Sequence, residues 1–206
     1  MISISIQAGG ESRRMGQNKA LMPFKGKPLV SFVADRLAAA ADELFVTANR
    51  PELYAFLGLP VYPDAIPGRG ALGGLLTALR QAHQPFVAVV ACDMPFASAA
   101  LLLHQAQLLQ TAPLDVAIPA TAQGLEPLHA VYRRETCLPV VEQAIAAGEW
   151  KLSLWLERVR VHILAPADWA PLDPRGLAFL NLNTPEEFSR AEAEGSDGPQ
   201  EPKAAA

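Results

Sequence analysis

The chain has few cysteines and no long apolar run. Only two of its 206 residues are cysteine, Cys92 and Cys137, which are too few for a disulfide framework. No apolar stretch approaches the roughly 20 residues that a membrane helix needs. The N-terminal residues MISISIQAGG also lack the charged segment and long apolar core of a signal peptide. We therefore expect a soluble, cytoplasmic protein that makes no membrane contact.

Signatures of zinc binding and of hydrolysis are also missing. The four histidines are scattered, and together with the two cysteines they show no zinc-ligand spacing. No G-x-S-x-G sequence indicates a serine hydrolase. Gly16 is followed by Gln17 and not by lysine, so the Walker spacing of an ordinary NTPase is absent. These absences exclude an ordinary NTPase loop and argue against a zinc site and a hydrolytic nucleophile.

Charge is unevenly distributed along the chain. The formal net charge is −4, which argues against a general nucleic-acid binder. Residues 1–36 nevertheless contain six basic and two acidic side chains, so this segment is locally +4 and the remainder is −8. A local basic cluster on an acidic protein suits a small anion better than a polyanion.

Strand-like and helical patterns alternate along the chain, which predicts an α/β sandwich with a mostly parallel sheet. The predicted strands are 2–6, 43–47, 59–62, 85–91, 115–118, 128–132, 160–164 and 179–182. The predicted helices are 28–41, 51–57, 72–83, 97–109, 134–147 and 151–159, and a last one starts at Thr184 as its N-cap. We expect one domain over residues 1–191. Residues 192–206, which have no apolar side chain beyond alanine, are expected to be a disordered tail.

The first candidate loop follows the first predicted strand. Gly9 and Gly10 allow backbone N–H groups to approach an anion closely. Arg13, Arg14 and Lys19 can neutralise phosphate charge. The pattern therefore indicates a triphosphate cradle. A surface turn with charged side chains for solubility is the alternative that the spacing leaves open.

The second candidate loop, residues 68–73, reads G-R-G-A-L-G and matches the dinucleotide fingerprint literally, with Asp93 twenty residues after its last glycine. The fingerprint should leave a strand directly, whereas Pro63 and Pro67 interrupt the approach. We favour the interpretation that Gly70, Gly73 and Gly74 allow close packing and bring a helix N-terminus toward a ligand.

The third candidate loop begins at the end of the most apolar predicted strand. Asp93 can project into the crevice beyond the sheet, where a carboxylate acts on phosphates through Mg²⁺. A helix N-cap is the alternative for Asp93, but Ser98 competes for that role. Cys92 is expected to be a small buried apolar residue.

These loops and several later motifs resemble the molybdenum cofactor guanylyltransferase family. The motifs cover nearly the whole chain except the tail and occur in the family's order. They are AGGESRRMGQNKAL (8–21), GKPL (26–29), TANR (47–50), GRGALGGL (68–75), CDMPF (92–96), EPLHAVY (126–132) and FLNLNTPEE (179–187).

The resemblance implies a Rossmann-like three-layer α/β sandwich of the nucleotide-diphospho-sugar transferase type. It also implies transfer of GMP from GTP to molybdopterin carrying molybdenum, with release of pyrophosphate. Mg²⁺ is the implied cofactor, and GTP and the molybdopterin cofactor are the implied partners. Transient contact with molybdoenzymes or their chaperones is a further implication.

The resemblance also assigns residues. Its nucleotide-binding residues are Gln7, Ala8, Gly9, Gly10, Lys19, Thr47, Asp64 and Asp93. Its catalytic residues are Arg14, Lys19 and Asp93, with Asp93 as the Mg²⁺ ligand. Its acceptor-side residues are Glu126, His129, Asn181 and Asn183. A capping or turn role beside Thr184 is the alternative for Asn183.

The sequence departs from the family at three positions in or next to these motifs. Gln7 replaces a leucine, Asn18 replaces an aspartate, and Thr47 replaces an asparagine that contacts the nucleotide. The third change leaves open a molybdopterin cytidylyltransferase or another small nucleotidyltransferase. A non-catalytic cofactor carrier and a dinucleotide-binding oxidoreductase are the alternatives from other classes.

Overall fold

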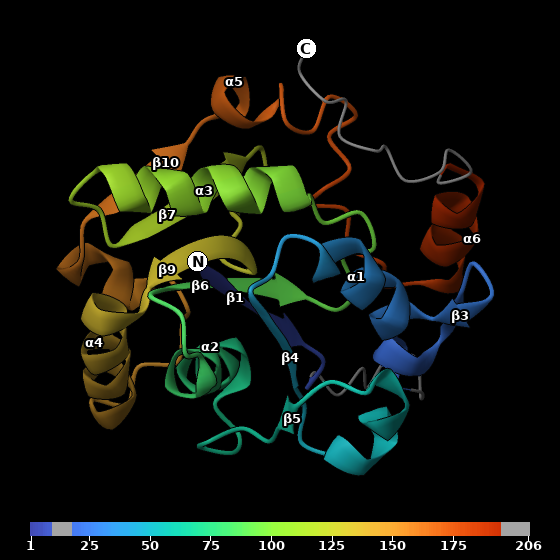
Figure 1. Ribbon diagram of the computed structural model, residues 1–206, viewed down its shortest axis with the longest axis horizontal. Helices are drawn as coiled ribbons and strands as arrows, with labels where there is room; N and C mark the ends of the chain where they lie inside the picture. Colours follow the sequence, from blue (N-terminus) through green and yellow to red (C-terminus); the bar gives the residue numbers. More distant parts are fainter. Residues whose placement is uncertain (10–17, 195–206) are drawn as a thin grey trace.

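The computed structural model describes residues 1–9 and 18–194, and within them a mixed sheet of eight strands lies between two layers of helices (Figure 1). The strand order is β10-β7-β9-β6-β1-β4-β5, and the short β8 pairs with β7. The strands are β1 (Ile2–Gln7), β4 (Glu43–Thr47), β5 (Val61–Tyr62), β6 (Phe86–Ala91), β7 (Val116–Thr121), β8 (Gly124–Leu125), β9 (His129–Arg133) and β10 (Val161–Leu164).

Parallel pairing dominates the centre of the sheet. Strand β1 pairs in parallel with both β4 and β6, and β4 with β5. Strand β9 is antiparallel to both β6 and β7. All six residues of β6 are buried, as expected for a central strand covered on both faces. The mostly parallel α/β sandwich predicted from the sequence is confirmed.

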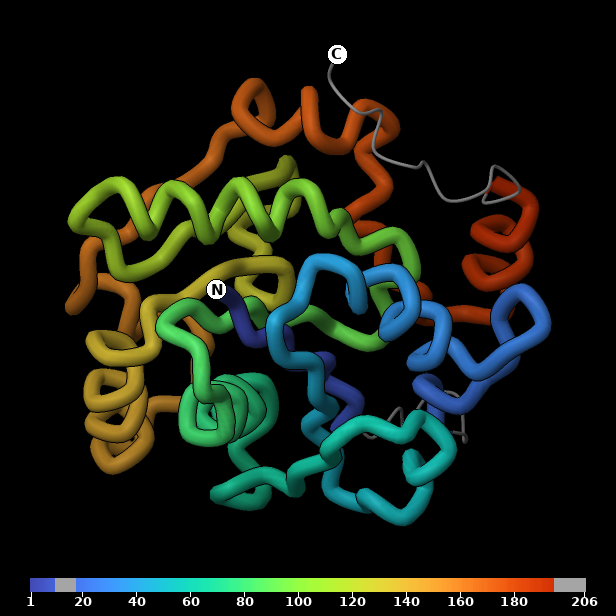
Figure 2. Tube along the Cα trace, viewed as in Figure 1, coloured from blue at the N-terminus to red at the C-terminus, as the bar shows by residue number. Residues whose placement is uncertain are grey.

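The helices cover the two faces of the sheet in pairs (Figures 1 and 2). Helices α1 (Leu29–Ala38) and α3 (Ala99–Thr111) pack with Ala88 and Val90 of β6. Helices α2 (Gly70–Gln81) and α4 (Arg134–Ala146) pack with the alternate residues Val87 and Val89. Because successive side chains of a strand point to opposite faces, one apolar strand supplies both cores.

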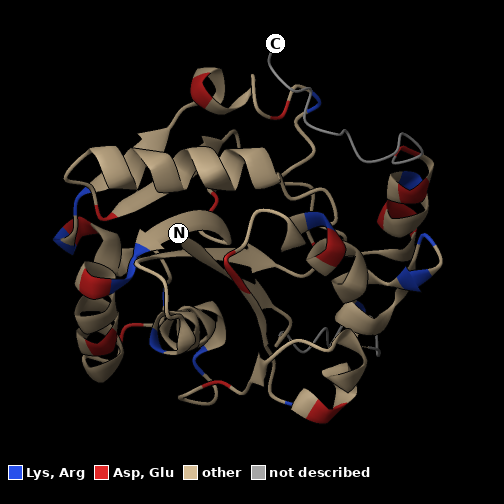
Figure 3. Cartoon of the chain, viewed as in Figure 1, with Lys and Arg blue, Asp and Glu red and all other residues tan. Residues whose placement is uncertain are grey.

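Charged side chains avoid this packed centre. Figure 3 shows no Lys, Arg, Asp or Glu on α3, on β1 or on β6.

None of the helices in residues 1–9 and 18–194 is both long enough and apolar enough to cross a membrane.

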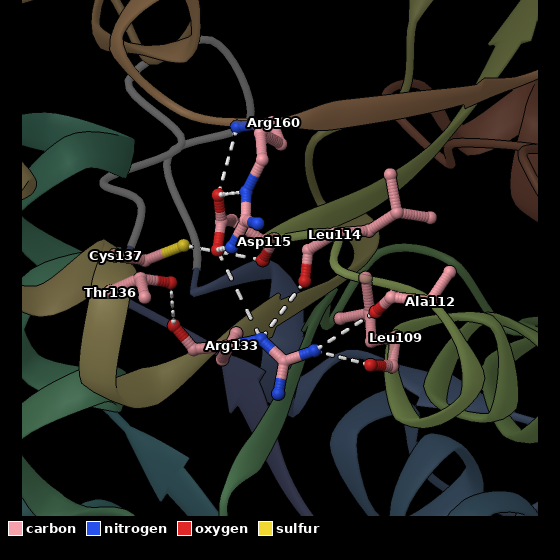
Figure 4. Close-up of polar contacts among 8 residues, drawn as sticks. All are labelled: Leu109, Ala112, Leu114, Asp115, Arg133, Thr136, Cys137 and Arg160. Atoms are coloured by element: carbon pink, nitrogen blue, oxygen red, sulfur yellow. Dashed lines mark hydrogen bonds and ion pairs between the residues drawn. The ribbon is translucent and has the colours of Figure 1, made fainter.

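Asp115, which directly precedes β7, is a charged residue that is buried in the protein (Figure 4). Asp115 accepts bonds from Nε and Nη2 of Arg160, both at 2.9 Å, and only 6% of its side chain is exposed. The neighbouring Arg133 donates to backbone carbonyls, including that of Leu114 at 2.9 Å. The Arg160 guanidinium lowers the pKa of Asp115 to about 2. This cluster ties β7, β9 and the residue before β10 together, away from the carboxyl ends of the parallel strands.

The C-terminal part of the chain differs most from the sequence prediction. The strand expected at 179–182 does not form, because this segment bonds to the chain after β6, with Leu182 N donating to Asp93 O at 3.0 Å. Helix α6 (Pro185–Glu194) continues past the expected domain boundary at residue 191. The rest of the predicted tail, 195–206, lies outside the described residues.

Two expected helices are short 3₁₀ segments, η2 (Pro51–Leu57) and η3 (Leu154–Arg158). A further 3₁₀ turn, η1 (Lys19–Leu21), precedes a small hairpin of β2 (Pro23–Phe24) and β3 (Lys27–Pro28) that was not predicted. Lys25 and Gly26 both have positive φ, as such a tight turn requires. A short helix, α5 (Pro166–Trp169), completes the described elements.

The two predicted helix caps are confirmed. Ser98 Oγ accepts from Leu101 N at 3.2 Å at the start of α3. Thr184 Oγ1 accepts from Glu187 N at 3.2 Å, and Glu187 Oε2 accepts from Thr184 N at 3.0 Å. This reciprocal capping box fixes where α6 begins, directly after Asn183.

Candidate functional site

A cavity of about 310 Å³ lies beyond the carboxyl ends of β1 and β6. Ligands of open α/β sheets bind at this edge, where strand ends and helix starts meet. The lining residues are Gln7, Ala8, Gly9, Asn18, Lys19, Ala20, Asp64, Gly70, Ala71, Gly74, Ala91, Cys92, Asp93 and Leu128. All three loops singled out in the sequence therefore contribute to one cavity.

Lys19 joins two distant segments at this cavity. Its Nζ donates to Asp93 Oδ2 at 2.9 Å and to Asn183 Oδ1 at 2.8 Å. The side chains of Lys19 and Asp93 are only 14% and 22% exposed, so solvent screens their attraction weakly. The bond from Leu182 N to Asp93 O holds Asn183 nearby. The predicted phosphate-binding lysine, the predicted metal ligand and one predicted acceptor residue thus converge.

The ammonium group of Lys19 lies between two oxygen atoms that could also bind a metal ion, Asp93 Oδ2 and Asn183 Oδ1. The carboxylate of Asp93 and the amide oxygen of Asn183 are both of the kind that Mg²⁺ prefers. No group of three or more His, Cys, Asp or Glu side chains suited to a metal occurs within residues 1–9 and 18–194. Mg²⁺ is commonly held by one or two carboxylates together with substrate phosphates, so the donor set fits this ion.

Asp64 is fixed at the cavity wall by Asn49. Asn49 Nδ2 donates to Asp64 Oδ2 at 2.9 Å, and Asp64 N donates to Asn49 Oδ1 at 3.0 Å. This reciprocal pair leaves the carboxylate of Asp64 with a defined orientation at the cavity. Sequence reasoning selected Thr47 and missed Asn49, which lies two residues further along the same TANR motif.

The structure does not place the side chain of Thr47 at the cavity. Thr47 is 1% exposed, and its hydroxyl bonds to Ser5 Oγ at 3.0 Å. Gln7 Nε2 lies 3.4 Å from the same hydroxyl. The hydroxyl of Thr47 is therefore turned into the sheet and away from the cavity, and the assignment of Thr47 as a nucleotide-binding residue stays a prediction.

Gln7 connects β1 to α2. Its Nε2 donates to Ser5 Oγ at 3.0 Å and to Gly74 O at 3.3 Å. A Cβ added at Gly74 would overlap Gln7 Oε1, so glycine is what lets the two elements approach. This contact supports the packing interpretation of the mid-chain glycines. Helix α2 starts at Gly70, which itself lines the cavity.

His129 does not face the cavity, contrary to the prediction. It is fully buried, and its Nε2 accepts from Ser98 N at 3.0 Å. Its ring packs edge-to-face against Phe179, with centroids 5.3 Å apart. Burial lowers the pKa of His129 to about 4, so the ring is neutral near pH 7. The alternation of β9 explains the error, because Leu128 lines the cavity and the next residue points into the core.

The remaining predicted residues fall into two groups. Glu126 and Asn181 do not line the cavity: Glu126 accepts from Thr121 Oγ1 at 2.9 Å, and Asn181 Nδ2 donates to Phe179 O at 3.2 Å. Burial raises the pKa of Glu126. Gly10 and Arg14 lie outside the described residues.

Cys92 lines the cavity but is chemically quiet. Its thiol is buried, and desolvation together with the nearby Asp93 raises its pKa to about 12. A protonated thiol is a poor nucleophile, which agrees with the small apolar role predicted for it. Its N–H donates to Gln7 O at 3.0 Å and thereby extends the β1–β6 pairing up to Asp93.

Comparison with known proteins identifies the family. The model of the MobA-like NTP transferase domain matches residues 4–161. The chain belongs to this family. Among related members, a protein named "Probable molybdenum cofactor guanylyltransferase" from Carboxydothermus hydrogenoformans is 37% identical over 189 residues, which cover 92% of this chain and 94% of that protein.

Solved structures place this family member in the expected fold. The molybdopterin-guanine dinucleotide biosynthesis protein A of Archaeoglobus fulgidus superposes with a TM-score of 0.83 at 28% identity, covering 93% of this chain and 97% of that one. The 4-diphosphocytidyl-2C-methyl-D-erythritol synthase of Anaerococcus prevotii superposes with a TM-score of 0.70 at 13% identity, over 94% and 97% of the two chains. The predicted nucleotide-diphospho-sugar transferase fold is confirmed.

Proposed function

We propose that this enzyme transfers GMP from GTP to the terminal phosphate of molybdopterin carrying molybdenum. The products are molybdopterin guanine dinucleotide and pyrophosphate. One observation carries the proposal: in a chain of the MobA-like family, Lys19 and Asp93 line a cavity at the carboxyl ends of β1 and β6, and the ammonium of Lys19 bonds to both Asp93 and Asn183. The cited relatives named for molybdenum cofactor chemistry support the choice of substrates.

The reaction is an in-line displacement. A phosphate oxygen of the acceptor forms a bond to the α-phosphorus of GTP, while the bond from that phosphorus to the oxygen bridging to the β-phosphate breaks. The bonding electrons leave with pyrophosphate. Because the acceptor phosphate is already anionic, no strong general base is required. This mechanism does not need His129 as a base, and the His129 ring is buried in the core.

Each cavity residue has a role in binding or orientation. Lys19 binds phosphate oxygens through its ammonium group, and the backbone of Ala8 and Gly9 lies against the nucleotide. The carboxylate of Asp64, held by Asn49, accepts a hydrogen bond from the nucleoside. Asp93 and Asn183 would hold Mg²⁺, which when bound neutralises charge between the two anionic reactants. Catalysis then rests on holding the two reactants in line and on neutralising the charge between them.

Turnover with each of the four NTPs tests the proposal directly. The purified protein, Mg²⁺ and molybdenum-loaded molybdopterin are incubated with one NTP at a time, and released pyrophosphate is measured. We expect release with GTP. Release with CTP and not GTP would favour the cytidylyl alternative, and release with neither would overturn nucleotidyl transfer.

Asp93→Ala separates an enzyme from a non-catalytic cofactor carrier. We expect this variant to lose at least about 100-fold in turnover, since a residue that holds charge at the reacting phosphates acts in the transition state. Asp35→Ala is the matched control, because Asp35 is an exposed carboxylate that pairs with Lys27. Full activity in Asp93→Ala would show that the metal site is wrongly assigned.

The same proposal includes the cellular setting. The enzyme acts in the cytoplasm, where the free thiols of Cys92 and Cys137 remain reduced. Its product is passed on through transient contact with molybdoenzymes or their chaperones. Pull-down with a molybdoenzyme chaperone before and after turnover tests that contact.

A further inference from the structure

One buried hydroxyl joins two segments of the cavity wall. Tyr54, in η2, is 1% exposed, and its Oη donates to Ala8 O at 3.1 Å. The same oxygen accepts from Asn18 Nδ2 at 2.9 Å. Ala8 follows β1 and Asn18 precedes η1, and both line the cavity, whereas Tyr54 lies behind it.

The directions of these bonds are fixed by the groups involved. A tyrosine hydroxyl has one proton, and an amide NH₂ can only donate, so the proton of Tyr54 is committed to Ala8 O. With Nδ2 of Asn18 toward Tyr54, its Oδ1 faces η1 and accepts from Ala20 N at 3.2 Å. Burial raises the pKa of Tyr54, so the hydroxyl keeps its proton near pH 7. The result is a continuous series of bonds from Ala8 to the first turn of η1.

Lys19 is the first residue of η1 and directly follows Asn18. A lysine side chain is long and flexible, so the position of its backbone decides which groups its ammonium reaches. In this structure Nζ reaches Asp93 and Asn183. Tyr54 therefore acts on Lys19 through Asn18, without touching the cavity itself.

We propose that Tyr54 is a positioning residue for nucleoside triphosphate binding. Its hydroxyl holds Ala8 and Asn18 at a fixed separation, so that the backbone at Ala8 and the ammonium of Lys19 are already placed to receive a triphosphate. A site ordered before binding loses less conformational entropy when the ligand arrives. The inference rests on the proposed function, because it takes the triphosphate of GTP as the ligand.

Tyr54→Phe tests the inference, since it removes the hydroxyl and keeps the ring in the core. We expect the Kd for GTP and the KM for GTP to rise about 5- to 10-fold, the size of one lost hydrogen bond. The KM for molybdopterin should not change, and kcat should change less than the KM for GTP. Equilibrium binding of GTP and steady-state kinetics measure these quantities.

Tyr132→Phe is the matched control. Tyr132 is also 1% exposed, and its hydroxyl also donates to a backbone carbonyl, that of Pro127 at 2.7 Å. We expect both variants to lose thermal stability, and only Tyr54→Phe to lose GTP affinity. Equal loss of affinity in both variants would reduce Tyr54 to an ordinary core contact and overturn the inference.

Asn18→Ser provides a second test that does not alter the core. Serine can still cap η1 but is too short to reach Tyr54, so it breaks the link between them; because Asn18 also lines the cavity, the double variant is needed to separate the two effects. We expect the same rise in the Kd for GTP as in Tyr54→Phe, and no further rise in the double variant. Additive losses would overturn the inference.

Binding of GTP to the unmodified protein distinguishes the proposed function from the positioning role of Tyr54. If the unmodified protein binds no nucleoside triphosphate, the proposed function is overturned and the inference with it. If it binds GTP and Tyr54→Phe binds GTP equally well, only the inference is overturned.

Discussion

The ammonium of Lys19 lies 2.9 Å from the carboxylate of Asp93, although 74 positions separate the two residues in sequence. The pairing places a cation from the start of η1 beside an anion from the end of β6. Both groups are largely shielded from solvent, so their mutual attraction is only weakly screened. Lys19 also bonds to Asn183, so one ammonium group holds together three segments of the candidate site.

Removing the charge of Lys19 should weaken nucleotide binding. We expect Lys19→Met to raise the KM for GTP about 10- to 100-fold, because a charge-assisted bond to phosphate is lost and Asp93 is left without its cation. Lys27→Met is the control, since Lys27 does not line the cavity and pairs only with Asp35 among the ion pairs found in the described residues. Steady-state kinetics with varied GTP measure the effect. An unchanged KM would contradict the assignment of Lys19 to the phosphates.

The contact between Gln7 and Gly74 predicts a coupled effect on stability. Gly74→Ala adds a methyl group that overlaps Gln7 Oε1, so the Gln7 side chain must shift and lose its bonds to Ser5 Oγ and Gly74 O, at a cost of about 1–3 kcal/mol in the free energy of unfolding. Alanine in a helix recovers about 1 kcal/mol of that loss. In a Gln7→Ala background the overlap disappears, so Gly74→Ala should become neutral or stabilising. Urea denaturation of the four proteins measures the coupling, and additive effects would rule out the overlap.

Asp115 predicts acid-sensitive stability. Arg160 lowers the pKa of Asp115 to about 2 in the folded state, below the ordinary 3.8. A lowered folded-state pKa gives stability that is fully present above pH 4 and is lost as the pH falls from 4 to 2. The contribution should be about 1–2 kcal/mol, less than the full shift implies, since Arg160 is partly exposed.

Asp115→Asn tests this effect by denaturation at several pH values. We expect the variant to show a smaller decrease in stability between pH 4 and pH 2 than the unmodified protein. Asp35→Asn is the control, because it removes a carboxylate from a solvent-exposed ion pair. The same pH slope in Asp115→Asn and the unmodified protein would disprove the role of Asp115.

His129 should affect stability and leave substrate binding unchanged. Its pKa falls from the ordinary 6.5 to about 4 on folding, so the unfolded chain binds a proton that the folded protein does not. Stability is therefore complete above pH 6.5 and decreases as the pH falls toward 4. His129→Gln keeps an acceptor for Ser98 N and should remove that decrease.

Activity separates this account of His129 from a role at the acceptor. At pH 7.5 we expect the KM of His129→Gln for molybdopterin to stay within about threefold of the unmodified protein, because the ring does not reach the cavity. A rise of tenfold or more with an unchanged melting temperature would restore the acceptor role.

The central elements could be predicted because local rules and tertiary packing agree there. The apolar residues 85–91 form the buried β6, and the caps at Ser98 and Thr184 begin the expected helices. The strand predicted at 179–182 was wrong, because an apolar run indicates that a segment is buried but not that it pairs with another strand. Its Leu182 is buried in a cluster with Phe24 and Phe96 instead of joining the sheet.

The site shows the same division. Lys19 and Asp93 could be chosen from the sequence, since both lie in loops that leave predicted strands, and such loops form the ligand-binding edge of the sheet. Thr47 and Asn49 could not be distinguished, because both lie at the end of one strand. The structure distinguishes them, because the Thr47 side chain is turned toward Ser5 inside the protein and the Asn49 side chain bonds to Asp64 at the cavity.

The sequence by itself determined the α/β alternation, the helix caps and the segments that supply charge to the cavity, because these depend on local periodicity and on strand ends. Only the tertiary structure decided which of those side chains meet. In the folded chain, His129 points into the core, Asn183 bonds to Lys19 from a distant part of the sequence, and Tyr54 links Ala8 to Asn18. These contacts depend on how separate segments pack, which no local sequence pattern encodes.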